Sequence, residues 1–356
     1  MMKKCLLLLG IATVAGAQNI IQLPDSIRAS TDTVVWVKKV PGYCEGPAYD
    51  AATGYVYFDR QIGNSTANWP IWRVKPGVDT GVIWLNTYQN NGLDFDPQGR
   101  LIASQNGRIS RYLPNGTLDS TLATFATSIQ VNDLSIGSNG AIYFTALSGT
   151  VYYLSPTRQM STAATGLSQA NGIEWLEDEN NVYVNETGQN RMRRLPVQSA
   201  GVLGTPASFI TSPSPDGGTV DSHGNRYVAS YGQGEVRVFN AHGDSIGRIA
   251  LRVASGIYDS VSSAGRVGIQ GNVDNCVFGG ADMKTLYITG DGGLYSIQLK
   301  IPGRVRYTTP IARFQLSPKN PNVESGIFRD LRGRWLMMSG KKNALMAIPV
   351  PNSNRK

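Results

Sequence analysis

The sequence predicts an all-β fold, specifically a six-bladed β-propeller, on two observations. First, a short polar signature recurs along the chain, and each copy runs into a short apolar stretch and then a tight turn. The turns fall near Gly54, Gly99, Gly140, Asn181 and Gly224, and this repeat of about 40–45 residues is typical of a propeller blade. Second, the expected strands, such as 55–58, 141–145 and 285–289, are rich in aromatic and β-branched residues, as strands prefer.

The first 17 residues have the pattern of a secretory signal peptide. Two lysines precede a short apolar run, residues 5–14, and Ala15-Gly16-Ala17 fits the cleavage pattern. The apolar run is too short to span a bilayer. We therefore expect residues 1–17 to be removed and the protein to be exported, periplasmic or secreted, with no membrane span.

Residues 18–303 are expected to form the propeller. Its six inner strands begin at the signatures, at Glu45, Asn91, Asn132, Asn171, Asp216 and Asn275. Segment 31–37 precedes the first blade and is expected to supply the outer strand of the last blade. Such a closure of the ring removes exposed sheet edges, which are otherwise prone to pair with other chains.

Residues 304–356 are predicted to be a C-terminal β extension. Within it, residues 325–337 repeat the strand–turn–strand rhythm but carry no polar ligand at the signature position. An appendage, an extra blade and a sorting module are all open interpretations of this segment, and six blades with an appendage is the preferred one.

Composition excludes several functional classes. Charged residues make up 16% of the chain, and the net charge of +8 is not gathered into a basic stripe, so we expect no nucleic-acid partner. The two histidines, His223 and His242, both lie in turn sequences, which disfavours a histidine-based triad or a histidine-ligated zinc site. Cys44 and Cys276 could bridge the first and last blades or remain buried thiols, and the oligomeric state is open.

The signatures predict a cation site. Inner strands of a propeller run in one direction along the central channel, so residues at their starts converge at one end of it. Glu45, Asn132, Asn171 and Asp216 would then form a ring of oxygen ligands. Oxygen ligands suit hard cations, so we expect one divalent cation, with Ca²⁺ preferred and Mg²⁺, Mn²⁺ and Zn²⁺ as alternatives. The competing interpretation is a polar channel that holds only water.

The same residues carry a family resemblance. From Tyr43 to Gly303 the chain resembles the senescence-marker-protein/gluconolactonase family, also called regucalcin-like. The matching stretches are Glu45-Gly46-Pro47, residues 91–101, Asn132-Asp133, residues 170–173, 215–217 with 220–225, and 275–280 with 284–289. The resemblance implies a six-bladed lactonase in which Glu45, Asn171 and Asp216 bind one divalent cation. It implies that Asn132 binds the metal, its water or the substrate, and that the substrate is an aldonolactone.

The chain departs from that family at the pocket wall. Some members carry an arginine two positions before the third-signature asparagine, and this chain has Gln130 there. The first blade carries an insertion, residues 60–72, with Trp69 and Trp72. The candidate substrate-binding residues are therefore Asn132, Gln130, Asn91, Tyr43 and Trp69, with Trp72 as a further wall residue.

The expected chemistry is hydrolysis of a small-molecule lactone. A cation would polarise the lactone carbonyl and stabilise the oxyanion, and Asp216 is the preferred general base for the attacking water. Two other hypotheses stay open. One is a hydrolase of other esters or phosphoesters that uses the same site, and the other is a non-catalytic propeller that binds carbohydrate or protein around a structural metal.

Overall fold

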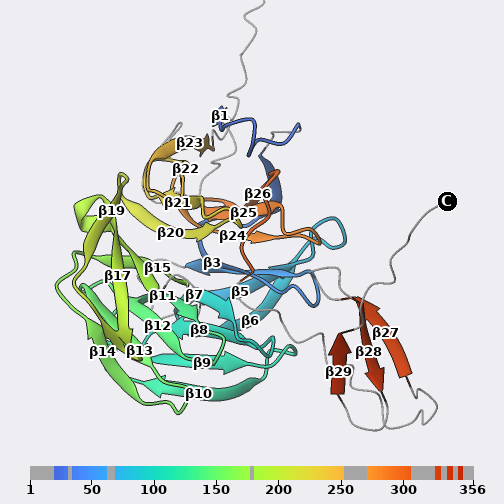
Figure 1. The fold of residues 1–356 in the computed structure, drawn as a ribbon, viewed down its shortest axis with the longest axis horizontal. Coiled ribbons are helices and arrows are strands. Elements are labelled where there is room, and N and C mark those ends of the chain that lie inside the picture. Colours follow the sequence, from blue (N-terminus) through green and yellow to red (C-terminus); the bar gives the residue numbers. More distant parts are fainter. Residues whose placement is uncertain are drawn as a thin grey trace, which may run out of the picture.

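The computed structural model describes residues 20–30, 34–61, 69–176, 180–251 and 271–305, and the backbone of three short strands at 325–329, 335–339 and 344–347. The fold is all-β, as predicted, and six sheets surround a central channel (Figure 1). A single-turn 3-10 helix, η2 (Thr187–Gln189), interrupts the fourth sheet. None of the helical segments in the described ranges has the length and apolar character needed to cross a membrane.

The first three blades are regular four-stranded antiparallel sheets. The first contains β3 (Tyr43–Tyr49), β4 (Val56–Gln61), β5 (Trp69–Val74) and β6 (Val82–Thr87). The second contains β7 (Asn90–Phe95), β8 (Leu101–Gln105), β9 (Arg108–Tyr112) and β10 (Leu118–Thr124). The third contains β11 (Val131–Ile136), β12 (Ile142–Ala146), β13 (Thr150–Leu154) and β14 (Met160–Ala164).

The fourth and fifth blades carry an additional strand, and the sixth takes its outer strand from the N-terminal segment. The fourth contains β15 (Ala170–Leu176), β16 (Asn181–Glu186), β17 (Arg191–Ser199) and β19 (Ala207–Thr211), and the short β18 (Val202–Leu203) pairs with the end of β17. The fifth contains β20 (Pro215–Val220), β21 (Arg226–Ser230), β22 (Glu235–Phe239) and β23 (Ser245–Ala250). The sixth contains β24 (Val273–Gly279), β25 (Thr285–Gly290) and β26 (Gly293–Gln298).

The N-terminal segment closes the ring. Strand β2 (Val35–Lys39) pairs antiparallel with β26 and becomes the outer strand of the sixth blade, which confirms the predicted closure, although residues 31–33 lie outside the described ranges. A second strand, β1 (Ile20–Gln22), was not predicted. It pairs with β23 as a fifth strand of the fifth blade, and Leu23 and Ile27 behind it are buried in the core between the last two blades.

Hydrophobic cores lie between neighbouring blades, and polar residues line the channel. Fully buried aromatic side chains such as Phe58, Tyr143 and Tyr227 pack where adjacent sheets meet. At the channel, every inner strand has a β-bulge or register irregularity within its signature. A bulge interrupts the alternation of side chains between the two faces of a strand, and bulges often redirect a side chain beside an active site.

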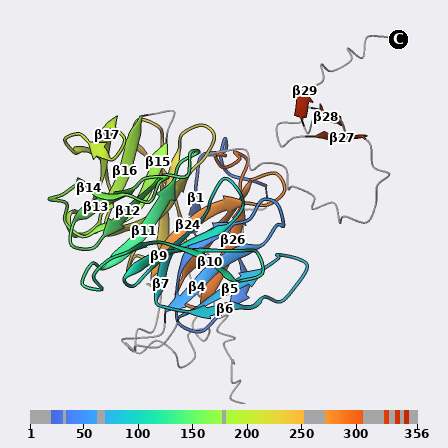
Figure 2. The same cartoon turned by 90° about the horizontal axis from the view of Figure 1, so that it is seen from below.

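The chain leaves the propeller at the end of the channel opposite to the signatures. Gly303 forms a bridge with Asp221, and the Arg304 amide donates to the Val220 carbonyl at 3.0 Å. Farther along, β27 (Ser325–Arg329), β28 (Trp335–Ser339) and β29 (Ala344–Ala347) form a separate sheet. In both views this sheet lies apart from the blades (Figures 1 and 2). The domain boundary at residue 303 and a sorting role for residues 304–356 stay predictions. The predicted signal peptide falls outside the described ranges, as do residues 255–270.

Candidate metal and catalytic site

The inner strands bring the signatures together at one end of the channel. Neighbouring strands approach so closely that the signature glycines are required there. A Cβ atom on Gly172 would lie 2.2 Å from the Asp216 carbonyl, and one on Gly217 would lie 1.9 Å from the side chain of Asn275. Glycine directly after the first polar residue of the signature therefore lets the fourth and fifth blades place Asn171 and Asp216 against the next blade.

Glu45 is buried at the start of β3. The Gly46 amide donates to its Oε2 at 2.9 Å, and the Tyr43 hydroxyl donates to its Oε1 at 3.4 Å. Burial first, and then the charge of Asp133, raise the pKa of Glu45 to about 8. Glu45 therefore lies in a crowded acidic environment, and its charge also acts on Asp216 and Asp274.

Asp216 and Asn171 lie side by side on adjacent blades. Burial first, and then the charges of Glu45 and Asp133, raise the pKa of Asp216, while a hydrogen bond with the Asn171 side chain opposes that rise. The Oδ1 atoms of Asp216 and Asn171 are buried, and neither has a hydrogen-bond partner among the described residues. Buried acceptors without partners are costly, so these two oxygens suit a ligand such as a cation.

Two acids that were not predicted belong to the same cluster. Asp133 faces the channel: its Oδ2 accepts from the Asn275 amide at 3.4 Å, across the channel from the sixth blade to the third. Asp274 is fully buried, and burial, Glu45 and Asp216 raise its pKa. We call Glu45, Asp133, Asp216 and Asp274, with the amides of Asn171 and Asn275, the acidic cluster.

In the third signature, the charge of Asp133 raises the pKa values of Glu45 and Asp216. Asn132 is also buried, and its carbonyl accepts a hydrogen bond from Ser104 at 2.6 Å. The sequence did hold a signal for Asp133, because it stands where four other copies have glycine. Gly92 in the preceding blade leaves room for it, since a Cβ there would lie 2.5 Å from Asp133 Oδ1.

The predicted wall residues are dispersed. Tyr43 lies on the cluster, and its ring faces that of Tyr231 at 6.2 Å between centroids. Trp69 is half-buried, and its carbonyl accepts from the Asn90 amide at 2.9 Å. Asn91 is half-buried, and its carbonyl lies against Gly46, whereas Gln130 is exposed. The proposed wall role of Trp72 is not supported, because Trp72 packs against the core between the first and sixth blades, with Lys38 over its ring.

The residues present fit a hard cation. Burial and neighbouring acids raise the pKa values of Glu45, Asp216 and Asp274, so a positive ion would relieve repulsion among them. The described residues contain no group of three or more acidic, histidine or cysteine side chains that could hold an ion alone. A cation would therefore need mixed carboxylate and amide ligands, as Glu45, Asn171 and Asp216 offer.

Cys44 and Cys276 are both buried free thiols. The Cys44 thiol lies near the Val40 and Gly42 carbonyls, and the Cys276 thiol lies near the Tyr227 carbonyl. Of the two alternatives left open by the sequence, the structure therefore shows the unbridged one.

A cavity occupies the channel on the other side of the cluster. It has a volume of about 150 Å³, and inner strands of all six blades contribute to its wall. Asp133 and Asn275 bound its inner end, while Ala51, Gly99 and Val305 lie at its outer end. We call it the axial cavity.

Comparison with known proteins places this architecture in a family. The family described as "SMP-30/Gluconolactonase/LRE-like region" matches residues 43–258. The lactonase drp35 of Staphylococcus aureus (strain MW2) is 32% identical over 184 residues, which cover 48% of this chain and 52% of that protein. The chain thus spans about half the length of the curated relatives it matches.

Solved structures share the fold. A gluconolactonase from Xanthomonas campestris superposes with a TM-score of 0.62 at 22% identity, over 80% of this chain and 98% of that one. A calcium-binding regucalcin from Agrobacterium tumefaciens superposes with a TM-score of 0.62 at 18% identity, over 75% and 94% of the two chains. Together with the match over residues 43–258, these findings show that the chain belongs to the SMP-30/gluconolactonase/LRE-like family.

Proposed function

We propose that this protein is a cation-dependent hydrolase of lactones, with sugar lactones as the first substrate class to test. One observation carries the proposal: Asn171 and Asp216 present buried oxygens that have no hydrogen-bond partner in the described part of the chain, beside Glu45 at the channel end where the signatures converge. Its relatives include proteins named lactonase and gluconolactonase. Because the matched relatives are covered only over about half their length, the activity is inferred for this chain.

Glu45, Asn171 and Asp216 would hold the cation, with Asn132 or Asp133 as a further oxygen ligand. Ca²⁺ is the preferred ion, because oxygen ligands of mixed charge and flexible geometry suit it. When bound, such a cation polarises a carbonyl and stabilises negative charge that develops on its oxygen. The solved calcium-binding relative supports the choice of ion for testing.

Asp216 is the proposed general base. In lactone hydrolysis the oxygen of water attacks the carbonyl carbon, the ring C–O bond breaks, and the proton from water ends on the departing ring oxygen. The carboxylate oxygen of Asp216 that does not bind the cation would accept that proton, and burial holds the carboxylate in place. Tyr43, whose hydroxyl already contacts Glu45, would help to position the substrate at the mouth.

A lactone panel tests this function. The protein is treated with chelator, reloaded separately with Ca²⁺, Mg²⁺ or Mn²⁺, and assayed for proton release from sugar, aliphatic and aromatic lactones, with phosphoesters as a matched control. We expect turnover of lactones only after reloading. Turnover of phosphoesters alone would move the protein to another hydrolase class, and tight ligand binding without product would favour a non-catalytic binder.

Export remains part of the proposal. It rests on the signal-like residues 1–17, and it is tested by fractionating cells and sequencing the N-terminus of the mature protein. We expect that N-terminus at Gln18, and retention of residues 1–17 on an intracellular protein would contradict export.

A further inference from the structure

The axial cavity approaches the acidic cluster from the end of the channel opposite to the signatures. Its outer end opens to solvent, since Ala51 is exposed and Val305 is 47% exposed. Its inner end is formed by Asp133 and Asn275. Asp133 also acts electrostatically on Glu45 and Asp216, so the cavity ends at two members of the acidic cluster itself.

Asp133 and Asn275 come from opposite blades and meet across the channel. The Asn275 amide donates to Asp133 Oδ2 at 3.4 Å, which is long for an N–H···O contact. Each side chain is also held by its own strand, because Asp133 Oδ1 accepts from the Leu134 amide and Asn275 Oδ1 from the Cys276 amide, both at 2.8 Å. Asp133 is 8% exposed and Asn275 is 7% exposed, whereas the neighbouring Asp274 has no exposed surface. Water in the cavity would therefore meet the cluster at this pair.

The size and wall of the axial cavity suit water. A volume of about 150 Å³ corresponds to about five water molecules at liquid density. Leu93, Ile173 and Cys276 make the middle of the wall mainly apolar. Polar groups stand at the two ends, with Asp133 and Asn275 inside and Thr219 nearer the outer end, so water would find partners where it enters and where it leaves.

We propose that the axial cavity is a second solvent entrance, through which water reaches the acidic cluster while a lactone occupies the mouth at the signature end. The proposal rests on the proposed function, because lactone hydrolysis consumes one water in each turnover. A lactone docked against the cluster covers the signature end, so the next water is best supplied from the opposite face.

The chain offers a matched pair of probes for the entrance itself. Cys44 and Cys276 are both buried thiols whose pKa values are raised by burial, but only Cys276 lines the axial cavity. The native protein is treated with methyl methanethiosulfonate, and the modified residue is identified by mass spectrometry over time. We expect Cys276 to be modified several-fold faster than Cys44, and equal rates would overturn the entrance.

Plugged variants then test its use. Thr219→Trp narrows the axial cavity, and Ala51→Trp covers its outer end. Ala52→Trp is the control, because it places the same side chain on the adjacent exposed residue, which does not line the cavity. Melting temperatures confirm that each variant is folded. We expect either plug to slow modification of Cys276 and to lower kcat several-fold with little change in KM, and Ala52→Trp to do neither.

These experiments separate the two proposals. If the wild-type protein turns over no lactone, the proposed function fails, and the labelling still decides whether the entrance exists. If plugged variants protect Cys276 from the reagent but keep the wild-type kcat, water does not use this route, and the inference is wrong while the lactonase function stands.

Discussion

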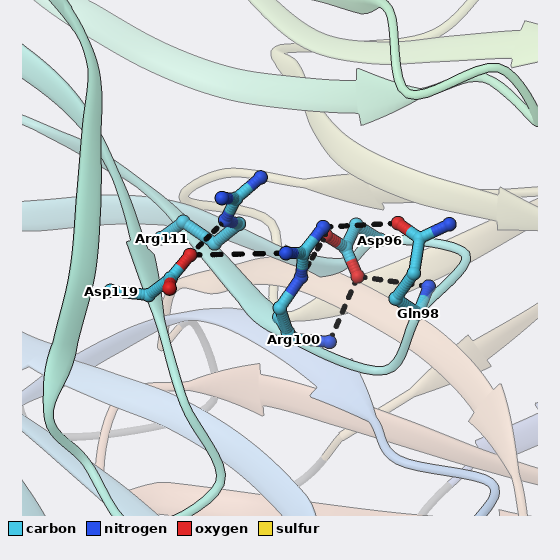
Figure 3. Close-up of polar contacts among 5 residues, drawn as sticks. All are labelled: Asp96, Gln98, Arg100, Arg111 and Asp119. Atoms are coloured by element: carbon cyan, nitrogen blue, oxygen red, sulfur yellow. Dashed lines mark hydrogen bonds and ion pairs between the residues drawn. The ribbon is translucent and has the colours of Figure 1, made fainter. Parts of the chain in front are cut away.

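Two buried aspartates in different blades, Asp96 in the second and Asp216 in the fifth, have opposite environments. Asp96 sits in the turn after β7 and accepts from the Gln98 amide at 3.0 Å, the Arg100 amide at 2.9 Å and Arg100 Nε at 2.8 Å (Figure 3). Arg100 also lies 3.8 Å from Asp119, which pairs with Arg111 at 2.5 Å (Figure 3). Asp216 has instead an amide on one side, acids on the other, and one oxygen without a partner in the described structure.

The same contrast recurs within one strand. Asp221 follows β20 and accepts from the His223 amide, the Asn225 amide and the Tyr227 hydroxyl, whereas Asp216 stands near the start of that strand. The carboxylate oxygens of the acids at the turns accept hydrogen bonds that hold each turn in place. Asp216 and Asp274 at the channel have carboxylate oxygens without a hydrogen-bond partner among the described residues, at a cost in stability, which indicates that these acids are kept for a ligand.

The largest expected effect comes from Asp216→Asn. This change keeps the shape of the side chain and removes the base, so kcat/KM on the best lactone should fall by about 10²–10⁴-fold, the range for loss of a general acid–base group. The metal-free variant should melt at the same temperature as the metal-free wild type or higher, because one source of repulsion is gone. Full activity in this variant would refute the role of Asp216.

Cation and pH should act together on stability. Burial raises the pKa of Glu45 from 4.5 to about 8, and the pKa values of Asp59, Asp216 and Asp274 are also raised. An acid with a raised folded-state pKa stabilises the fold below its unfolded pKa and loses that contribution as the pH rises through the folded value. The melting temperature of the metal-free protein should therefore fall between pH 4.5 and 8.

Added Ca²⁺ should reverse that fall. At about 100 times its dissociation constant it would stabilise the fold by about 2.7 kcal/mol, and most strongly at the alkaline end, where the acids are ionised. Thermal melts at several pH values, with chelator or with Ca²⁺, measure both effects. Asp274→Asn should make the fall shallower, and a metal-free melting temperature that rises with pH would show that the acids are not strained.

Gly217→Ala tests the close approach of the fifth and sixth blades. The new methyl group would overlap the Asn275 side chain, and we expect a loss of about 1–3 kcal/mol in unfolding free energy, as for overpacking of a core. Gly204→Ala is the control, because its Cβ would lie 3.2 Å from the flexible end of Gln198 and 3.5 Å from the Pro196 carbonyl, which is an ordinary contact. Denaturant unfolding of both variants measures the difference, and equal losses would argue against tight contact at the signatures.

The smallest expected effect is that of Asp96→Ala. It removes the acceptor for two turn amides and for Arg100, and these groups are only partly shielded from water. We expect a loss of about 1–2 kcal/mol in unfolding free energy and no change in kcat/KM. A drop in activity comparable with that of Asp216→Asn would remove the distinction between turn acids and channel acids.

Several features could be predicted because they depend on repetition. Six copies of a signature with matched turns imply six equivalent sheets, and closure by the segment before Glu45 follows from the need to cover an edge; β2 confirms it. Strand β1 could not be predicted, because three residues carry no periodicity of their own and are a strand only where β23 offers its edge.

The amino-acid sequence alone determined the fold class, the order of the blades and the strand starts from which the acidic cluster is built. The tertiary structure alone decided which side chains face inward. Each signature contains a bulge or register irregularity. The alternation of side chains between the two faces of a strand therefore fails there. For this reason no regular sequence pattern predicts that Asp133 and Asp274 belong to the cluster. The axial cavity is likewise invisible in the sequence, because residues from all six blades enclose it only when the ring is closed.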